Sequence, residues 1–362
     1  MGRLFPLLLF LPLLVSAVSG QDSPSPQLQP RTPAPSPAAS TDANREIALD
    51  VQVTDKSGAP VRGLQKQDFT VLDDKRPQNI ISFHAEDNGA ASTTDPVEVV
   101  LVLDAVNTSP ISISYVRSEL KKFLLQNGGK LALPTSLLIF TDTETKMENG
   151  SSRDGNALAA LYDQYETGLR YSNRSQGVYG AEERFAMSLK MLTSLVAYEG
   201  TQPGRKLMIW FSPGWPMLSG PNIQFSNKNG QYFFDSIVAA SSGLRQARIT
   251  LYSIDPLGMA DAGGVQTFYY EEFLKGVASA RRAQPGNLAL QVLAVQSGGR
   301  VLNSTNDVTA AIADCAADAD AFYVLSFDAA RADRANEYHA VQVTVDKPRI
   351  KARTRTGYYA QP

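Results

Sequence analysis

The sequence predicts an α/β protein with a doubly wound, mostly parallel sheet and a small β-sandwich-like module formed by the chain ends. Three observations support this fold class. Between residues 96 and 320, short apolar strands alternate with helical segments, which is typical of a parallel sheet covered by helices. Both chain ends alternate apolar and polar residues with the period of two expected for half-buried strands. The apolar run Val97–Leu103 ends in Asp104, as a buried strand does when it carries a carboxylate to the carboxyl edge of a sheet.

The first segment, residues 1–20, is typical of a secretory signal peptide. Arg3 supplies a positive charge, Leu4–Val18 is largely apolar, and small residues follow at Ser19-Gly20. The apolar stretch is too short to cross a bilayer stably, since a spanning helix takes roughly 20 residues. We therefore expect an exported protein, periplasmic or extracellular, whose mature chain has no membrane span.

The next segment, residues 21–45, is rich in proline and serine. A segment of this composition cannot bury enough apolar surface to fold, which predicts a disordered linker. We expect the folded part of the chain to begin at residue 46.

Both ends of the folded part are predicted to be β-structure. The N-terminal β-module, residues 46–92, and the C-terminal strands, residues 321–362, each hold too few strands to be comfortably stable alone. We therefore expect the two ends to pack on each other, with the α/β domain inserted between them. The strands expected there are Ile47–Thr54, Phe69–Leu72, Ile80–Phe83, Ala321–Phe327, Tyr338–Val345 and Ile350–Arg355.

The segment 96–320 supplies the alternating strands and helices of the sheet. The expected strands are Val97–Leu103, Thr135–Thr141, Lys206–Phe211, Ile249–Ile254 and Arg300–Leu302. The expected helices are Ser112–Leu125, Asn156–Tyr165, Ala181–Tyr198, Phe234–Gln246, Phe268–Ser279, Leu288–Gln296 and Val308–Ala317. This order places the helices on both faces of a mostly parallel sheet.

The net charge and the cysteine content exclude some classes of function. The 362 residues include 34 basic and 36 acidic ones, a formal charge of −2, so no global field attracts nucleic acid or an anionic membrane. Cys315 is the only cysteine, which excludes an intramolecular disulfide, and its alanine-rich surroundings predict a buried thiol.

Several segments resemble a von Willebrand factor A (VWA) domain and, more closely, the bacterial VWFA-related family described mainly from acidobacteria. The matching segments are Val53–Gly58, Val61–Leu64, Asp68-Phe69, Pro203–Lys206, Trp210–Pro216, Tyr323–Leu325 and Arg355–Tyr359. The resemblance covers about residues 46–360. It implies a VWA-like domain over residues 96–320, with a degenerate metal-ion-dependent adhesion site.

In VWA domains that bind ligands through a metal, Asp-x-Ser-x-Ser follows the first strand, and a threonine and an aspartate from later loops complete the site. Asp104 matches the first position and Thr108 the last serine, but Val106 offers no oxygen and Pro213 stands where the later aspartate is expected. The resemblance therefore implies that no cofactor is bound, with weak Mg²⁺ or Ca²⁺ binding as the alternative. A retained metal site would use Asp104, Thr108 and Ser109, with Asn107 as a further oxygen donor.

Three interpretations of Asp104, Asn107 and Thr108 stay open. In the first, Asp104 has a structural role and caps the loop or helix that follows it. In the second, the residues hold a weakened metal site. In the third, they contact a partner directly, as loops at the ends of strands often do.

A protein partner is expected at the loop rim of this edge. The predicted contact residues are Asp104, Asn107, Thr108, Ser212 and Trp215, and the long polar stretches Tyr171–Gly180 and Ser219–Gly230 are expected on the same rim. Trp215 would contact the partner if exposed, and packs against its own loop in the alternative interpretation.

Enzymatic chemistry is not expected. The sequence contains no His-Glu-x-x-His, Gly-x-Ser-x-Gly or phosphate-binding loop, and its two histidines, His84 and His339, lie far apart in predicted strands. The favoured function is an exported, non-enzymatic protein-binding or scaffold module that works without a metal. The alternative is a Mg²⁺- or Ca²⁺-dependent adhesin, and a hydrolase is the least favoured.

Overall fold

The computed structural model describes residues 45–87, 96–142, 145–147, 150–166, 177–216, 218, 227–256 and 269–362. The predicted signal peptide, nearly all of the predicted linker, and most of the stretches 171–180 and 219–230 lie outside these residues. All described residues belong to one compact unit. Within them, no helix has both the length and the apolar character needed to cross a membrane.

The central sheet of the described chain is doubly wound. Its parallel strands are β5 (Val97–Asp104), β6 (Lys130–Phe140), β9 (Arg205–Phe211), β10 (Ile249–Ile254) and β11 (Val301–Leu302). β7 (Thr145–Met147) and β8 (Ser152–Asp154) pair antiparallel with β6. The order is β11-β10-β9-β5-β6-β7, so the chain changes direction across the sheet between β5 and β9. Ligand sites of open α/β sheets lie at such a switch point.

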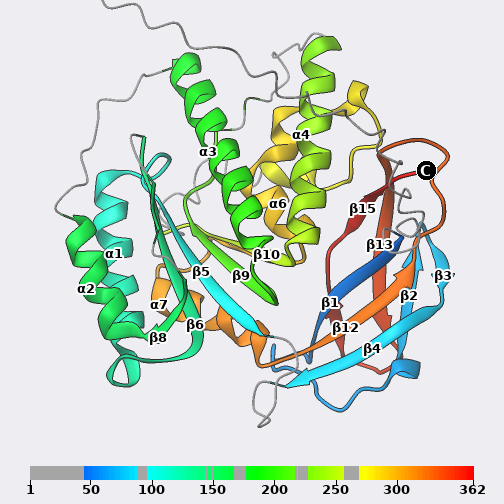
Figure 1. The fold of residues 1–362 in the computed structure, drawn as a ribbon, viewed down its shortest axis with the longest axis horizontal. Coiled ribbons are helices and arrows are strands. Elements are labelled where there is room, and N and C mark those ends of the chain that lie inside the picture. The colour runs from blue at the N-terminus through cyan, green and yellow to red at the C-terminus, as the bar shows by residue number, and fades with distance from the viewer. Residues whose placement is uncertain are drawn as a thin grey trace, which may run out of the picture. The chain divides into compact units, whose positions relative to one another are not determined.

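Helices cover both faces of this sheet (Figure 1). α1 (Pro110–Leu125), α2 (Gly155–Glu166) and α7 (Val308–Ala316) share an apolar core with one face. The other face packs against three helices: α3 (Gly177–Glu199), α4 (Asn227–Gln246) and α6 (Leu290–Gln296). Side chains of β5 enter both cores alternately, which explains why its sequence is apolar throughout rather than alternating.

Two four-stranded antiparallel sheets form the β-module. The first has the order β14-β1-β12-β4 and the second β15-β13-β2-β3. N-terminal strands pair with C-terminal ones: Leu49 lies opposite Leu325, and Val71 opposite Val343. The strands are β1 (Glu46–Thr54), β2 (Phe69–Asp73), β3 (Arg76–Gln78), β4 (Ile80–Asp87), β12 (Ala321–Asp328), β13 (Glu337–Val345), β14 (Lys351–Arg353) and β15 (Gly357–Ala360). One apolar cluster joins the two sheets. The predicted fold class is therefore confirmed.

The predicted helix Phe268–Ser279 was wrong. The described part of this segment has one short 3₁₀ helix, η4 (Tyr270–Phe273), and two more follow, η5 (Ala280–Arg282) and η6 (Pro285–Leu288). The reason lies in packing: the ring of Tyr338 approaches Gly276 so closely that a Cβ atom there would lie 1.9 Å from Cζ. A regular helix would place side chains where this ring lies.

A buried polar network joins the β-module to the central domain at Asp318, which lies in the 3₁₀ helix η7 (Ala317–Ala319). Its backbone carbonyl accepts hydrogen bonds from Arg205 Nη1 at 3.0 Å and Gln52 Nε2 at 3.1 Å. Its carboxylate accepts from the Tyr252 hydroxyl and the Arg353 guanidinium. The Arg205 guanidinium also lies 4.5 Å from the ring centroid of Phe322. Asp318 thus binds side chains from both parts of the molecule.

Candidate functional site

The candidate site lies at the switch point between β5 and β9. Leu103 pairs with Phe211, so the next residues, Asp104 and Ser212, follow neighbouring parallel strands at the same carboxyl edge. The chain continues from β5 into α1 on one face and from β9 towards α4 on the other. The predicted edge position of Asp104 is where this topology places ligand sites.

The Asp104 carboxylate is fully buried and accepts four N–H hydrogen bonds. Its Oδ1 accepts from the backbone amides of Val106 at 3.0 Å and Asn107 at 2.9 Å. Its Oδ2 accepts from Asn107 Nδ2 at 2.8 Å and from Trp210 Nε1 at 3.0 Å. A carboxylate offers about four lone-pair positions, so these donors use the whole set. This geometry favours the structural interpretation, in which Asp104 holds the loop that follows it.

Burial and hydrogen bonding act on Asp104 in opposite directions. Burial raises the pKa of its carboxyl group, while hydrogen bonds from Asn107 and Trp210 favour the charged form and lower it; the net shift is upward. Asn107 Nδ2 also donates to the Ser188 hydroxyl of α3 at 2.8 Å. Asp104 and Asn107 therefore tie the loop after β5 to both β9 and α3.

The residues around Asp104 do not fit a divalent cation in this arrangement. Val106 is fully buried in the apolar core, and Ser109 is the N-cap of α1, where its hydroxyl accepts from the Ser112 amide at 3.2 Å. Two oxygen atoms close to Asp104 in sequence, Asn107 Oδ1 and Thr108 Oγ1, have no hydrogen-bond partner among the described residues. Two oxygens beside a saturated carboxylate fall well short of the oxygen-rich coordination that Mg²⁺ and Ca²⁺ require.

The loop after β9 is also closed on itself. The Ser212 hydroxyl accepts from the Gly214 amide at 3.2 Å, and Gln291 Nε2 donates to the Pro213 carbonyl at 3.0 Å. Trp215 is buried, with its ring 5.3 Å from that of Trp210 at 71°. The exposed indole considered from the sequence is not found, because Trp215 completes the core on the α3/α4 face.

The predicted contact residues are therefore together but mostly inaccessible. Asp104, Thr108, Ser212 and Trp215 are buried, and Asn107 is partly exposed. Their side chains hold the loops after β5 and β9 in place. In this conformation they offer little surface to a partner.

Three exposed apolar side chains lie on the same edge; Tyr179 falls within the stretch Tyr171–Gly180 that was expected on the rim, whereas Ile111 and Tyr232 were not predicted. Ile111 in the first turn of α1 is 81% exposed, Tyr179 in the first turn of α3 is 84% exposed, and Tyr232 near the start of α4 is 57% exposed. α3 reaches past the sheet, since Ser188 lies level with Asn107 and Tyr179 lies about 13 Å further along the axis. Figure 1 shows α3 and α4 extending beyond the strands. We call these three residues the apolar rim.

Their signal was present in the sequence. The sheet does not cover an apolar residue that lies beside the proline in the first turn of a helix. Nor does it cover one in the part of a helix that extends beyond the neighbouring strand. Locating such a residue requires the helix starts, and these were predicted too late: Ala181 and Phe234 instead of Gly177 and Asn227.

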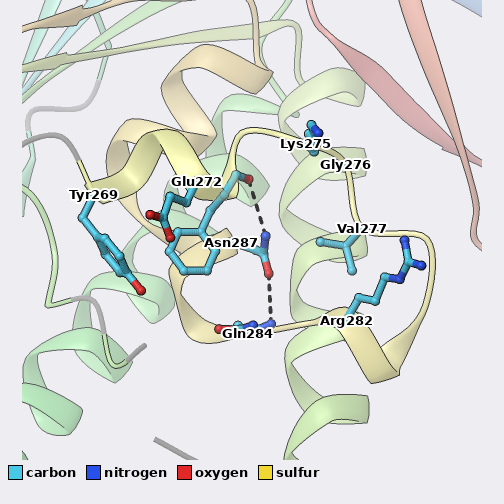
Figure 2. Close-up of a pocket in the computed structure, with 9 residues that line it drawn as sticks. Tyr269, Glu272, Lys275, Gly276, Val277, Arg282, Gln284 and Asn287 are labelled. Carbon is cyan, nitrogen blue, oxygen red and sulfur yellow. Dashed lines mark hydrogen bonds between the residues drawn. The ribbon is translucent and has the colours of Figure 1, made fainter. Parts of the chain in front are cut away.

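A cavity of about 610 Å³ lies between η4, η6 and the connection that joins them. Figure 2 shows the residues that line it. Glu272, Lys275 and Arg282 line it with exposed charged side chains. Asn287 shapes its wall by donating to the Phe273 carbonyl at 3.4 Å and accepting from the Gln284 amide at 2.9 Å. A second cavity, of about 410 Å³, includes Asp320 in its lining. Each lining contains a single carboxylate, so neither offers the converging carboxylate pair of a glycosidase-like site.

Comparison with known proteins finds no matching family model and no matching curated protein. Solved structures give three distant similarities. Human COPII-coat protein Sec24c aligns over 74% of this chain and 44% of its own, with 8% identity and a TM-score of 0.34. A mutant PilB minor pilin from Streptococcus sanguinis aligns over 75% and 78%, with 12% identity and a TM-score of 0.33. The pilus adhesin SpaC from Lactobacillus rhamnosus GG aligns over 82% and 48%, with 10% identity and a TM-score of 0.34.

This chain thus spans less than half the length of Sec24c and SpaC. TM-scores of 0.33 to 0.34 are too low to support an argument about family or activity.

Proposed function

We propose that this chain is an exported, non-enzymatic protein-binding module of VWA type, which engages its partner with the apolar rim and without a metal. The observation that carries the proposal is the exposure of Ile111, Tyr179 and Tyr232 on helix starts that share one edge of the sheet. Large apolar and aromatic side chains that remain exposed in this way are typical of contact surfaces between proteins.

The buried loops support the proposal by fixing the positions of the rim. Asn107 bonds to Ser188, which ties the loop that leads into α1 to α3. Phe233, next to Tyr232, is buried with Phe185 of α3 in one apolar cluster, which holds α4 against α3. A binding surface on such braced helices loses little conformational entropy on association. Mechanistically, the module associates with its partner and carries out no reaction.

The chemistry at Asp104 supports a metal-independent mode. A cation at this carboxylate would have to displace N–H donors that are held by the backbone of Val106 and Asn107 and by the buried Trp210 indole. Calorimetric titration with Mg²⁺, Mn²⁺ and Ca²⁺ tests this point. We expect the wild type and Asp104→Ala to give the same heats, because no cation binds at Asp104. A binding heat that is lost on Asp104→Ala would favour the Mg²⁺- or Ca²⁺-dependent adhesin instead.

Rim substitutions test the proposed surface. With the protein as bait on envelope extracts of its source organism, we expect a partner captured by the wild type to be lost on Ile111→Ser/Tyr179→Ser/Tyr232→Ser. Aromatic anchors at interfaces contribute about 2 kcal/mol or more each, so the loss should exceed tenfold. The matched control is Ile81→Ser/Leu125→Ser, because these apolar residues are also exposed, at 48% and 42%, but lie outside the apolar rim. Equal capture by the rim variant and the control would contradict the proposal.

A further inference from the structure

The β-module contains a cluster of one histidine and two aspartates. Asp73 ends β2, Asp74 begins the turn to β3, and His339 lies on β13, which pairs with β2. His339 Nδ1 is 3.0 Å from Asp73 Oδ1 and 3.7 Å from Asp74 Oδ2. One ligand atom from each residue lies within 4.8 Å of the other two.

The remaining oxygens of the two carboxylates are held by other groups. The Tyr358 hydroxyl donates to Asp73 Oδ2 at 2.9 Å, and the Ala340 amide donates to Asp74 Oδ1 at 2.9 Å. These bonds orient Asp73 Oδ1 and Asp74 Oδ2 towards the imidazole. Metal ligands in proteins are commonly oriented by outer hydrogen bonds of this kind.

The His339 imidazole is also oriented, with its Nδ1 towards the two carboxylates. Its ring stacks on Tyr358, with centroids 5.2 Å apart and an interplanar angle of 26°. Its Nε2 is buried and has no hydrogen-bond partner among the described residues, so the polar contacts of the ring are those of Nδ1 with the two carboxylates. The ring is therefore oriented by the cluster itself.

The backbone holds Asp74 in an uncommon conformation. Asp74 and Lys75 both have positive φ, 46° and 67°, and they join the paired residues Asp73 and Arg76 in a two-residue hairpin. Asp73 and His339 are buried, whereas the Asp74 side chain is 52% exposed. An ion can enter from the Asp74 side, where water can complete its coordination.

We propose that Asp73, Asp74 and His339 form a site for a divalent transition-metal ion of the Zn²⁺ class. Ligand atoms about 2.0–2.2 Å from one ion lie about 2.8–3.6 Å apart at octahedral or tetrahedral angles. The separation of Nδ1 from Asp73 Oδ1, 3.0 Å, falls in this range, and its separation from Asp74 Oδ2, 3.7 Å, lies just above it. Imidazole with carboxylates suits Zn²⁺, Ni²⁺, Co²⁺ or Cu²⁺ better than Mg²⁺ or Ca²⁺. The metal joins the β2–β3 hairpin to β13 and takes the place of the hydrogen bond between Nδ1 and Asp73.

Zn²⁺ titration of the purified protein, prepared without a histidine tag and stripped of metal with a chelator, tests the site. We expect one Zn²⁺ per chain by calorimetry, and an affinity at least about tenfold lower for Asp74→Asn. Asparagine keeps the acceptor for the Ala340 amide and tolerates positive φ, so this variant preserves the fold while it removes the anionic ligand.

Two controls separate this site from other Zn²⁺ ligands. His84→Gln removes the other histidine, which is exposed, and Asp346→Asn removes an exposed carboxylate of the same module; both should bind Zn²⁺ like the wild type. The visible absorption of bound Co²⁺ should appear in the wild type and both controls and be lost in Asp74→Asn. No Zn²⁺ binding by the wild type, or equal binding by Asp74→Asn, would overturn the proposal.

Discussion

At the scale of single residues, Asp104 shows how a buried charge decides the role of its neighbours. An isolated carboxylate in an apolar core is very costly, so it must be hydrogen-bonded, neutralised or bound to a metal. Here two backbone amides, one amide side chain and one indole supply the hydrogen bonds. Trp210 can reach Asp104 because Val102 pairs with Trp210, which places Asp104 and Trp210 on the same face of the sheet. Asp104 is thus a structural acceptor.

Asp104→Asn should test this role. Its amide nitrogen would face at least one N–H group that now donates to the carboxylate, leaving a buried donor without an acceptor. We expect the free energy of unfolding, measured in urea, to fall by about 2–4 kcal/mol. The control is Asp163→Asn, whose carboxylate forms an exposed ion pair with Lys121 at 2.7 Å and should contribute less than about 1 kcal/mol. Similar losses for the two variants would argue against a saturated carboxylate at Asp104.

Glu199, at the end of α3, should make stability depend on pH. Burial and the charge of Glu98 raise the pKa of its carboxyl group from 4.5 to about 7, and Lys206 opposes this shift. Because the folded state binds this proton more tightly than the unfolded state, stability should fall as pH rises from about 4.5 to 7. The full effect of this group on the free energy of unfolding is on the order of 3 kcal/mol.

Urea unfolding at pH 5 and pH 8 measures this effect. We expect Glu199→Gln to be more stable than the wild type at pH 8 and the difference to shrink at pH 5, since glutamine carries no charge to bury. Glu183→Gln, which changes an exposed residue of the same helix, should leave the pH dependence unchanged. An unchanged pH dependence in Glu199→Gln would place the titrating group elsewhere.

At the scale of elements, the apolar pattern located the longer strands of the described chain and missed several of the shortest. The predicted strand Ile249–Ile254 matches β10 because both of its faces are buried. β7 and β8 were not predicted, since three-residue strands at an edge carry too short a pattern. β15 was missed for a similar reason, since Gly357–Ala360 has only four residues, although all of them are buried.

The position of the candidate site residues on the sheet could be predicted from the sequence, but the burial of their side chains could not. The apolar run before Asp104 and the strand before Ser212 indicated the correct edge of the sheet. The hydrogen bonds that saturate Asp104 could not be predicted, because they require the pairing of β5 with β9 and the turn at Asn107. The apolar rim was located in part, because Tyr179 lies in the stretch Tyr171–Gly180 that was expected there, while the helix starts predicted at Ala181 and Phe234 left Tyr232 outside its helix.

At the scale of the whole molecule, the two ends of the described chain depend on each other. Of the N-terminal strands, β1 pairs with β12 and β14, and β4 pairs with β12; the pairing internal to residues 45–87 is that of β2 with the short β3. Through Asp318, a polar network then joins β1 and β14 of this module to β9 and β10 of the central sheet. An inserted domain of this kind must bring both ends together before the module can form its core.

A fragment of residues 46–92 should therefore be unfolded, because its strands lose nearly all their partners and half of the shared apolar cluster. Circular dichroism should show no cooperative thermal transition. The same fragment joined by a short flexible linker to residues 321–362 should regain one, since it restores the β1–β12 and β2–β13 pairs. Cooperative folding of 46–92 alone would mean that the N-terminal strands carry their own core, and the insertion of the α/β domain would then be no constraint on how this protein folds.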